Sequence, residues 1–327
     1  MLQLAQSLLP LGSRLLYLTH FGSRLYGTDT LTSDTDLKGV FLPSLQDIVL
    51  GKVKDTIEYN TGDDKSKNNT NDIDITMYSL QYFMTLLTTG EVGAIDLLFS
   101  MFRSSTILYE EKQTTDYLRT NYKSLISKQS KRFVGYCFNQ AAKYGIKGSR
   151  YGDLLTVHEF LSTIKAVDAP ISEIVNKLPV LSYVSLVKIG ILEYIQILGK
   201  LHQTNLPVYE LKQRVEKALD SYGHRTRTAF TSQGVDWKAL SHAYRVIYQM
   251  HELASKEMIV FPLGIADKLR TIKTNTDIVL LQPIVDELAV LLAEVSTAVD
   301  NSSLPDFIDD EFIATTILSA YNLKKEN

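Results

Sequence analysis

Two aspartates separated by one residue, Asp34 and Asp36, follow a short apolar segment and a turn rich in glycine, serine and threonine. In an extended chain alternate side chains point to the same side, so this spacing holds the two carboxylates together. Neighbouring carboxylates repel each other, and a shared divalent cation is the usual way in which proteins keep them side by side. The sequence therefore predicts a metal site where the second apolar strand begins.

A third carboxylate on a neighbouring strand would complete such a site. The alternating segment DIDITMY offers Asp74, with Asp72 on the same side as the alternative. We expect Asp74 to be the third ligand, because it lies deeper in the strand while Asp72 borders a polar hairpin tip.

The corner formed by Gly22 and Ser23 lies between an apolar strand and a segment that favours a helix. Glycine lets backbone N–H groups approach a phosphate closely, and the serine hydroxyl adds a donor. Ser33 directly precedes the acid pair and is placed to orient Asp34 or the phosphate. A glycine-serine pair alone is more often a simple turn, and Ser-Asp-x-Asp alone is more often a helix cap or a solvated loop. Their combined spacing, with a third acid, favours catalysis.

The elements that must position these residues change character near residue 110. Before it, short apolar and alternating segments predict strands and a hairpin, followed by a helix from Ser79. Beyond it almost no strand signal remains, and apolar residues recur with helical spacing over 112–144, 154–166, 171–201, 208–222, 237–255 and 281–299. We predict an α+β protein, with a small mixed-sheet domain at 1–110 followed by an all-helical domain at 111–327.

Composition narrows the class of protein. The 327 residues carry 34 basic and 37 acidic side chains, and 45% are hydrophobic, which is typical of globular proteins and not of disordered or fibrous ones. The single cysteine, Cys137, excludes a disulfide framework, and the histidines lack the spacing of zinc ligands. His242 and Arg245, three residues apart on a predicted helix, are expected to be structural. No stretch predicts a signal peptide or a membrane span, so we expect a soluble cytoplasmic protein without membrane contact.

Positive charge is concentrated in residues 112–152, which contain nine basic residues and one acidic residue and so carry a net charge of +8. Aromatic residues alternate with the basic ones, a composition typical of nucleic-acid tracks and of pockets for a triphosphate and a base. We expect triphosphate contacts from Lys128, Lys131 and Arg132. The outer basic residues, Lys143, Lys147 and Arg150, are candidates for binding RNA or another acceptor. The alternative is a solvated helix face that pairs with the acidic remainder of the chain.

The order Gly-Ser, Asp-x-Asp and a later third acid resembles the DNA polymerase β-like nucleotidyltransferase superfamily. The segments GSRLYG, SDTDLKGV, DITMYSLQYF, SKRFVGYCFNQ and SHAYR are similar to its predicted nucleotidyltransferase branch in bacteria and phages, some members of which accompany RNA-repair ligases. The resemblance extends over residues 15–145 and, more loosely, over 237–320. TGEVGAIDLL departs from that branch, where a Gly-Asn-Pro turn and a glutamate are typical.

The resemblance implies a metal-dependent enzyme that moves a nucleoside monophosphate from an NTP to a hydroxyl group and releases pyrophosphate. Asp34, Asp36 and Asp74 would hold Mg²⁺ or Mn²⁺, and Gly22 and Ser23 would contact the phosphates. The helical domain would close over nucleotide and acceptor. An RNA end such as that of tRNA, a protein side chain and a small molecule all stay open as acceptors, and the location would be the host cytoplasm for a phage protein. The alternative is a catalytically silent nucleic-acid-binding module with the same fold.

Overall fold

The computed structural model describes residues 1–62, 72–131, 151–181, 183–220 and 235–323. The chain forms two compact units. The first unit comprises Met1–Cys137, His242–Thr271 and Glu287–Asn327, and the second comprises Phe138–Ser241 and Ile272–Asp286. This division differs from the single boundary predicted near residue 110, because His242–Thr271 and Glu287–Asn327 return to the first unit.

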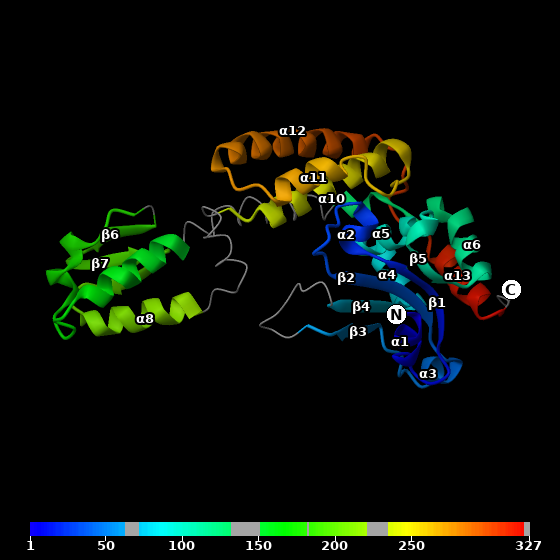
Figure 1. Ribbon diagram of the computed structural model, residues 1–327, viewed down its shortest axis with the longest axis horizontal. Coiled ribbons are helices and arrows are strands. Elements are labelled where there is room, and N and C mark those ends of the chain that lie inside the picture. The colour runs from blue at the N-terminus through cyan, green and yellow to red at the C-terminus, as the bar shows by residue number, and fades with distance from the viewer. Residues whose placement is uncertain (63–71, 132–150, 182, 221–234, 324–327) are drawn as a thin grey trace. The chain divides into compact units, whose positions relative to one another are not determined.

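A five-stranded mixed sheet forms the centre of the first unit (Figure 1). Its strands follow the order β3-β4-β2-β1-β5, in which β2 and β4 are parallel and the other pairs are antiparallel. Their bounds are β1 Arg14–His20, β2 Thr35–Leu42, β3 Thr56–Asn60, β4 Ile73–Ser79 and β5 Ile107–Glu110. The predicted α+β class, with a mixed sheet near the N-terminus, is confirmed.

The two faces of this sheet differ because side chains alternate along each strand. One face packs against α1, Leu2–Ser7, through a buried apolar cluster that includes Leu37 of β2 and Ile75 of β4. The opposite face carries the residues in between, which include Asp36 and Asp74. The alternation that buries one face therefore presents the two carboxylates on the other.

Ten α-helices of the described part of the chain belong wholly or partly to the first unit. They are α1, α2 Gly22–Tyr26, α3 Leu45–Val49, α4 Leu80–Thr88, α5 Val92–Ser100, α6 Lys112–Thr120, α10 Trp237–Lys256, α11 Ala266–Lys273, α12 Leu281–Asp300 and α13 Asp310–Ala320. The predicted helix after Ser79 is confirmed as α4, and the Ser79 hydroxyl caps it by accepting from the Tyr82 N–H at 3.2 Å.

The helix predicted at 112–144 is shorter in its described part. α6 ends at Thr120, and two 3₁₀ turns follow, Tyr122–Leu125 and Lys128–Ser130. The Asn121 side chain donates to the Tyr117 carbonyl at 2.9 Å, and the Ser127 hydroxyl accepts from the Gln129 N–H at 3.4 Å. Such local side-chain bonds compete with helix continuation.

The second unit departs most from the predicted secondary structure. The segment predicted as a helix at 171–201 contains instead a three-stranded antiparallel sheet of β6 Val184–Ile189, β7 Leu192–Ile197 and β8 Lys200–Gln203. Gly190 and Gly199, at φ +61° and +85°, allow the two tight turns. β-branched residues, which favour extended backbone, recur in β6 and β7. The prediction of an all-helical domain is therefore wrong here.

Helices predicted around this sheet are confirmed. A helix whose described part is 151–163 and α8, Val208–Asp220, share a buried core with the sheet. This core includes Leu154 and Val157 of the first helix, Ile195 and Ile197 of β7, and Leu211 of α8. Among the described residues, no single helix is long and apolar enough to cross a membrane; α4 and α5 together reach that length but bend by 117°.

Candidate functional site

The three aspartates singled out from the sequence lie together in the first unit. One carboxylate oxygen from each of Asp34, Asp36 and Asp74 lies within 4.8 Å of the other two. Asp36 and Asp74 face each other in the register of the parallel strands β2 and β4, and Asp34 directly precedes β2. All three side chains are half-buried. A set of hard carboxylate oxygens at this spacing fits Mg²⁺ or Mn²⁺.

Asp72 takes a different position, close to the hairpin. Its backbone carbonyl accepts from the Thr35 N–H at 2.9 Å, which joins the entry of β4 to the start of β2. Its carboxylate faces Gly62, because a Cβ built on that glycine would lie 3.4 Å from Oδ2 of Asp72. Asp74 is therefore the carboxylate that the structure brings to the pair.

We expect Asp74→Ala to weaken Mn²⁺ binding by about 100-fold and Asp72→Ala to change it by less than about threefold. The reason is that Asp74 belongs to the oxygen cluster, whereas the Asp72 carboxylate lies towards the hairpin. Titration of Mn²⁺ followed by electron paramagnetic resonance measures both affinities. A larger loss in Asp72→Ala would move the third ligand to that residue.

Gly22 lies against the Asp36 carboxylate. Its φ is +56°, and a Cβ built on it would lie only 2.1 Å from Oδ2 of Asp36. The preceding residue, Phe21, donates its N–H to the Asp36 carbonyl at 2.8 Å, which fixes the corner against β2. The sequence predicts that this glycine allows close approach to a phosphate. In the structure the close neighbour is the carboxylate, which any larger side chain would displace.

The two serines expected near the site differ in their surroundings. Ser23 lies in the first turn of α2, and its hydroxyl is buried without a hydrogen-bond partner among the described residues. The Ser33 hydroxyl accepts from the Thr30 N–H at 2.9 Å, and the Ser33 N–H donates to the Thr30 carbonyl at 3.1 Å. Ser33 thus closes the turn that leads into Asp34.

The basic residues expected at the triphosphate form ion pairs in the described part of the chain. Lys128 Nζ lies 3.2 Å from Asp306 Oδ1, and Lys131 Nζ lies 2.6 Å from Asp300 Oδ1. Both acids are exposed, so these pairs are weak and a polyanion can replace them. Arg132, like the outer basic residues at 143, 147 and 150, lies outside the described residues. A role for this segment in nucleotide or RNA binding stays a prediction.

A buried polar network next to α2 was not predicted from the sequence. Asp96 of α5 is fully buried, and its carboxylate accepts from the Tyr26 hydroxyl at 2.8 Å, from Arg245 Nη1 at 2.9 Å and from Gln249 Nε2 at 2.7 Å. The Arg245 guanidinium also lies 4.1 Å from the centroid of the Tyr26 ring and 3.1 Å from Nδ1 of His242. These contacts fit the structural role expected for His242 and Arg245.

Burial dominates the electrostatics of this network. It raises the pKa of Asp96, although the Arg245 guanidinium acts in the opposite direction. It also raises the pKa of Tyr26 well above its ordinary value, and the nearby carboxylates of Asp96 and Asp36 add to that rise. Tyr26 ends the short helix that Gly22 begins, so the network holds the far end of α2 beside the aspartate cluster.

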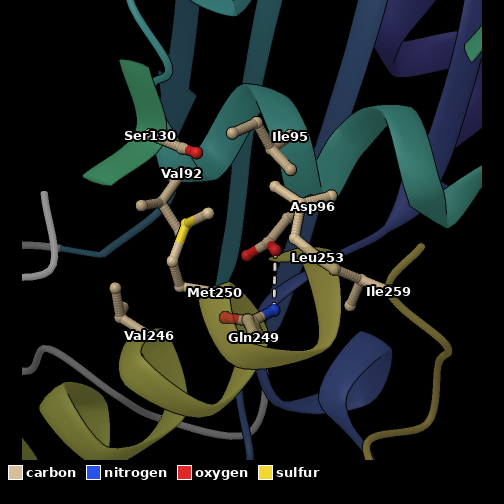
Figure 2. A pocket seen from close by; sticks show the side chains of 9 residues that line it. All are labelled: Val92, Ile95, Asp96, Ser130, Val246, Gln249, Met250, Leu253 and Ile259. Carbon is tan, nitrogen blue, oxygen red and sulfur yellow. Dashed lines mark hydrogen bonds between the residues drawn. The ribbon is translucent and has the colours of Figure 1, made fainter. Parts of the chain in front are cut away.

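A small, mostly apolar pocket lies beside the network, between α5 and α10 (Figure 2). Figure 2 shows Asp96 and Gln249 on its wall, joined by their hydrogen bond. The other lining residues are Val92, Ile95, Ser130, Val246, Met250, Leu253 and Ile259. None of the three clustered aspartates lines this pocket.

Comparison with known proteins relates the part of the chain that holds the aspartate cluster to a known family. Residues 2–153 match the model of the RNA repair pathway DNA polymerase beta family. A protein of Enterobacteria phage T4, described as an uncharacterized 38.9 kDa protein in the nrdC-mobD intergenic region, is 32% identical over 323 residues. That alignment covers 90% of this chain and 96% of the phage protein. No solved structure matches the chain significantly.

Proposed function

Since this chain belongs to the RNA repair pathway DNA polymerase beta family, we propose that it is a metal-dependent nucleotidyltransferase. It moves a nucleoside monophosphate from an NTP to a hydroxyl group. The observation that carries the proposal is the cluster of Asp34, Asp36 and Asp74 at the ends of two parallel strands. Three carboxylates this close have a clear chemical use in holding divalent cations next to a triphosphate.

In this proposal Asp34, Asp36 and Asp74 hold Mg²⁺ or Mn²⁺. When bound, the metal neutralises phosphate charge and lowers the pKa of the attacking hydroxyl. Asp74 accepts the proton of that hydroxyl. The hydroxyl oxygen forms a bond to the α-phosphorus while the bond from that phosphorus to the bridging oxygen breaks, and pyrophosphate leaves with the electron pair.

The corner before α2 supplies neutral donors for the nucleotide. The first turn of α2 has no side-chain cap, so its backbone N–H groups stay available to phosphate oxygens. Ser23 adds a hydroxyl that no described residue uses. Gly22 and Ser23 would in this way contact the β- and γ-phosphates.

We further propose that the acceptor is the hydroxyl of an RNA end, such as that of a tRNA, and that the enzyme acts in the host cytoplasm. The description of the family as part of RNA repair supports the first point, and the similar phage protein supports the second. The basic segment at 112–152 would bind the RNA backbone through its charge. A protein side chain or a small molecule as acceptor is an outcome of the test below.

Incubation with each α-labelled NTP, Mg²⁺ or Mn²⁺, and total cellular RNA and protein is expected to place label in RNA. Asp34→Asn and Asp36→Asn should each lower the transfer rate by at least about 100-fold, because an amide is a poor ligand for a hard cation. Their melting temperatures should stay unchanged or rise, since charge repulsion is relieved.

The matched control is Asp168→Asn, which removes an exposed carboxylate far from the cluster in sequence and should leave the rate unchanged. Near wild-type transfer in either cluster variant contradicts the metal assignment. If the wild-type protein transfers no label from any NTP, yet binds RNA equally well with and without a chelator, the chain is a binding module and the enzyme proposal fails.

A further inference from the structure

A lysine, Lys38, lies on the same sheet face as the aspartates. Lys38 follows Asp36 by two residues on β2, so both side chains point to the same side. The spacing along the strand is about 7 Å. Opposite Lys38 in the register lies Thr76, two residues beyond Asp74 on β4. A positive charge therefore lies next to the metal cluster, deeper along the same two strands.

The Lys38 ammonium contacts two aromatic rings and one tyrosine hydroxyl. Nζ lies 4.5 Å from the centroid of the Phe21 ring and 5.4 Å from that of Tyr78, and it donates to the Tyr78 hydroxyl at 3.3 Å. Among the described residues it makes no ion pair with a carboxylate. Lys128 and Lys131, which were expected to contact the triphosphate, are by contrast each paired with an acid.

The space around this ammonium is kept open by a glycine. A Cβ built on Gly93, in the first turn of α5, would lie 2.8 Å from Lys38 Nζ. Glu91 on the same turn uses its carboxylate to cap α5, where Oε2 accepts from the Ala94 N–H at 2.8 Å. An ammonium has three donors, and the contact with Tyr78 takes up one of them, so two remain for a ligand.

We propose that Lys38 binds the diphosphate part of the nucleotide, the part that leaves as pyrophosphate; this assignment rests on the proposed function. Phe21, against which the ammonium packs, directly precedes the Gly22-Ser23 corner. An anion at that corner therefore lies beside a cation that forms no ion pair with any carboxylate in the described part of the chain. A lysine is a strongly hydrated point charge suited to phosphate oxygens, and such charged hydrogen bonds are about twice as strong as neutral ones.

The simpler alternative is that Lys38 only offsets the charge of the three aspartates. A lysine with that role would be expected to contact one of the carboxylates directly. Lys38 instead donates to the Tyr78 hydroxyl and lies close to the rings of Phe21 and Tyr78, and it forms no ion pair with a described carboxylate. The two roles differ in pyrophosphate binding: loss of Lys38 weakens it if the ammonium contacts the diphosphate, and leaves it unchanged if the ammonium only offsets charge.

The probe is inorganic pyrophosphate with Mn²⁺, measured by isothermal titration calorimetry on the full chain. Lys38→Met keeps the aliphatic stem against Phe21 and should weaken pyrophosphate binding about tenfold or more. Lys38→Arg restores a cation and should recover part of the affinity. Lys52→Met, at an exposed lysine of the same unit, is the matched control and should behave like the wild type.

Mn²⁺ binding without pyrophosphate, followed by electron paramagnetic resonance, separates the loss of a diphosphate contact from damage to the metal cluster. We expect Lys38→Met to bind Mn²⁺ as tightly as the wild type or more tightly, because a positive charge beside the cluster is lost. Unchanged pyrophosphate affinity in Lys38→Met overturns the assignment, as does a loss of Mn²⁺ affinity equal to the loss for pyrophosphate. If the wild-type protein binds neither Mn²⁺ nor pyrophosphate, the proposed function itself fails and the assignment falls with it.

Discussion

Replacing Gly22 with alanine is expected to lower Mn²⁺ affinity and nucleotide transfer by at least about 100-fold. The new Cβ would lie 2.1 Å from Oδ2 and 2.9 Å from Cγ of Asp36, so the carboxylate must leave its position. Asp36 faces Asp74 across β2 and β4 and shares the cluster with Asp34. Displacement of one of three ligands by about 1 Å is enough to cost two orders of magnitude.

Gly51→Ala provides a matched control for this prediction. Gly51 has a φ of +64°, close to the +56° of Gly22, but a Cβ built on it meets nothing within 4 Å. Both alanines pay the same backbone cost of roughly 1–2 kcal/mol for a left-handed conformation. Only Gly22→Ala should therefore lose Mn²⁺ binding in the paramagnetic resonance titration. Equal effects of the two variants would show that backbone strain, and not the Asp36 carboxylate, explains the glycine.

The acidic cluster could be predicted because every relation in it is local or follows from strand alternation. The spacing of Asp34 and Asp36 is set by the period of an extended chain, and Asp74 was found as an acid on another alternating segment. What the sequence could not supply is the close approach of Gly22 to Asp36, which depends on how the corner before α2 folds back on β2.

The sheet in the second unit shows the limit of reading apolar periodicity. The segment at 171–201 has enough apolar residues to fit a helix as well as short strands, a known ambiguity of such runs. The two glycines at 190 and 199 and the β-branched residues between them were the available signals for turns and strands. In the folded chain, these local signals outweigh the helical spacing of the apolar residues.

The buried pair of Asp96 and Arg245 could not be predicted, because the two residues are 149 positions apart. Each residue can be recognised in the sequence by itself: Asp96 lies inside the apolar run IDLLFS, and Arg245 lies in SHAYR. A charged residue in an apolar helix requires a partner, but a single sequence does not say where that partner lies. Only the return of α10 to the first unit brings the two together.

Of the variants proposed for this protein, those that remove Arg245 are expected to lose the most stability. Arg245→Met should lower the free energy of unfolding by about 3–5 kcal/mol, because it leaves a fully buried carboxylate without its cation. Urea unfolding can be followed by circular dichroism and by the fluorescence of Trp237, the single tryptophan, which lies on the same helix. The network also holds the end of α2, so Mn²⁺ affinity of the folded variant should fall as well.

An ion pair of an arginine and a carboxylate at the surface provides the comparison with the buried pair. Arg214 and Glu210 lie four residues apart on α8 at 3.1 Å, both partly exposed, and Arg214→Met should cost no more than about 0.5 kcal/mol. Adding Asp96→Leu to Arg245→Met should recover part of the lost stability, since the unpaired buried charge is gone while Tyr26 and Gln249 still lack their acceptor. A loss below about 1 kcal/mol in Arg245→Met would mean that Asp96 is held without the arginine. In that case the hydrogen bonds with Tyr26 and Gln249 are enough to hold Asp96 in its uncharged form. The raised pKa of Asp96 favours that form.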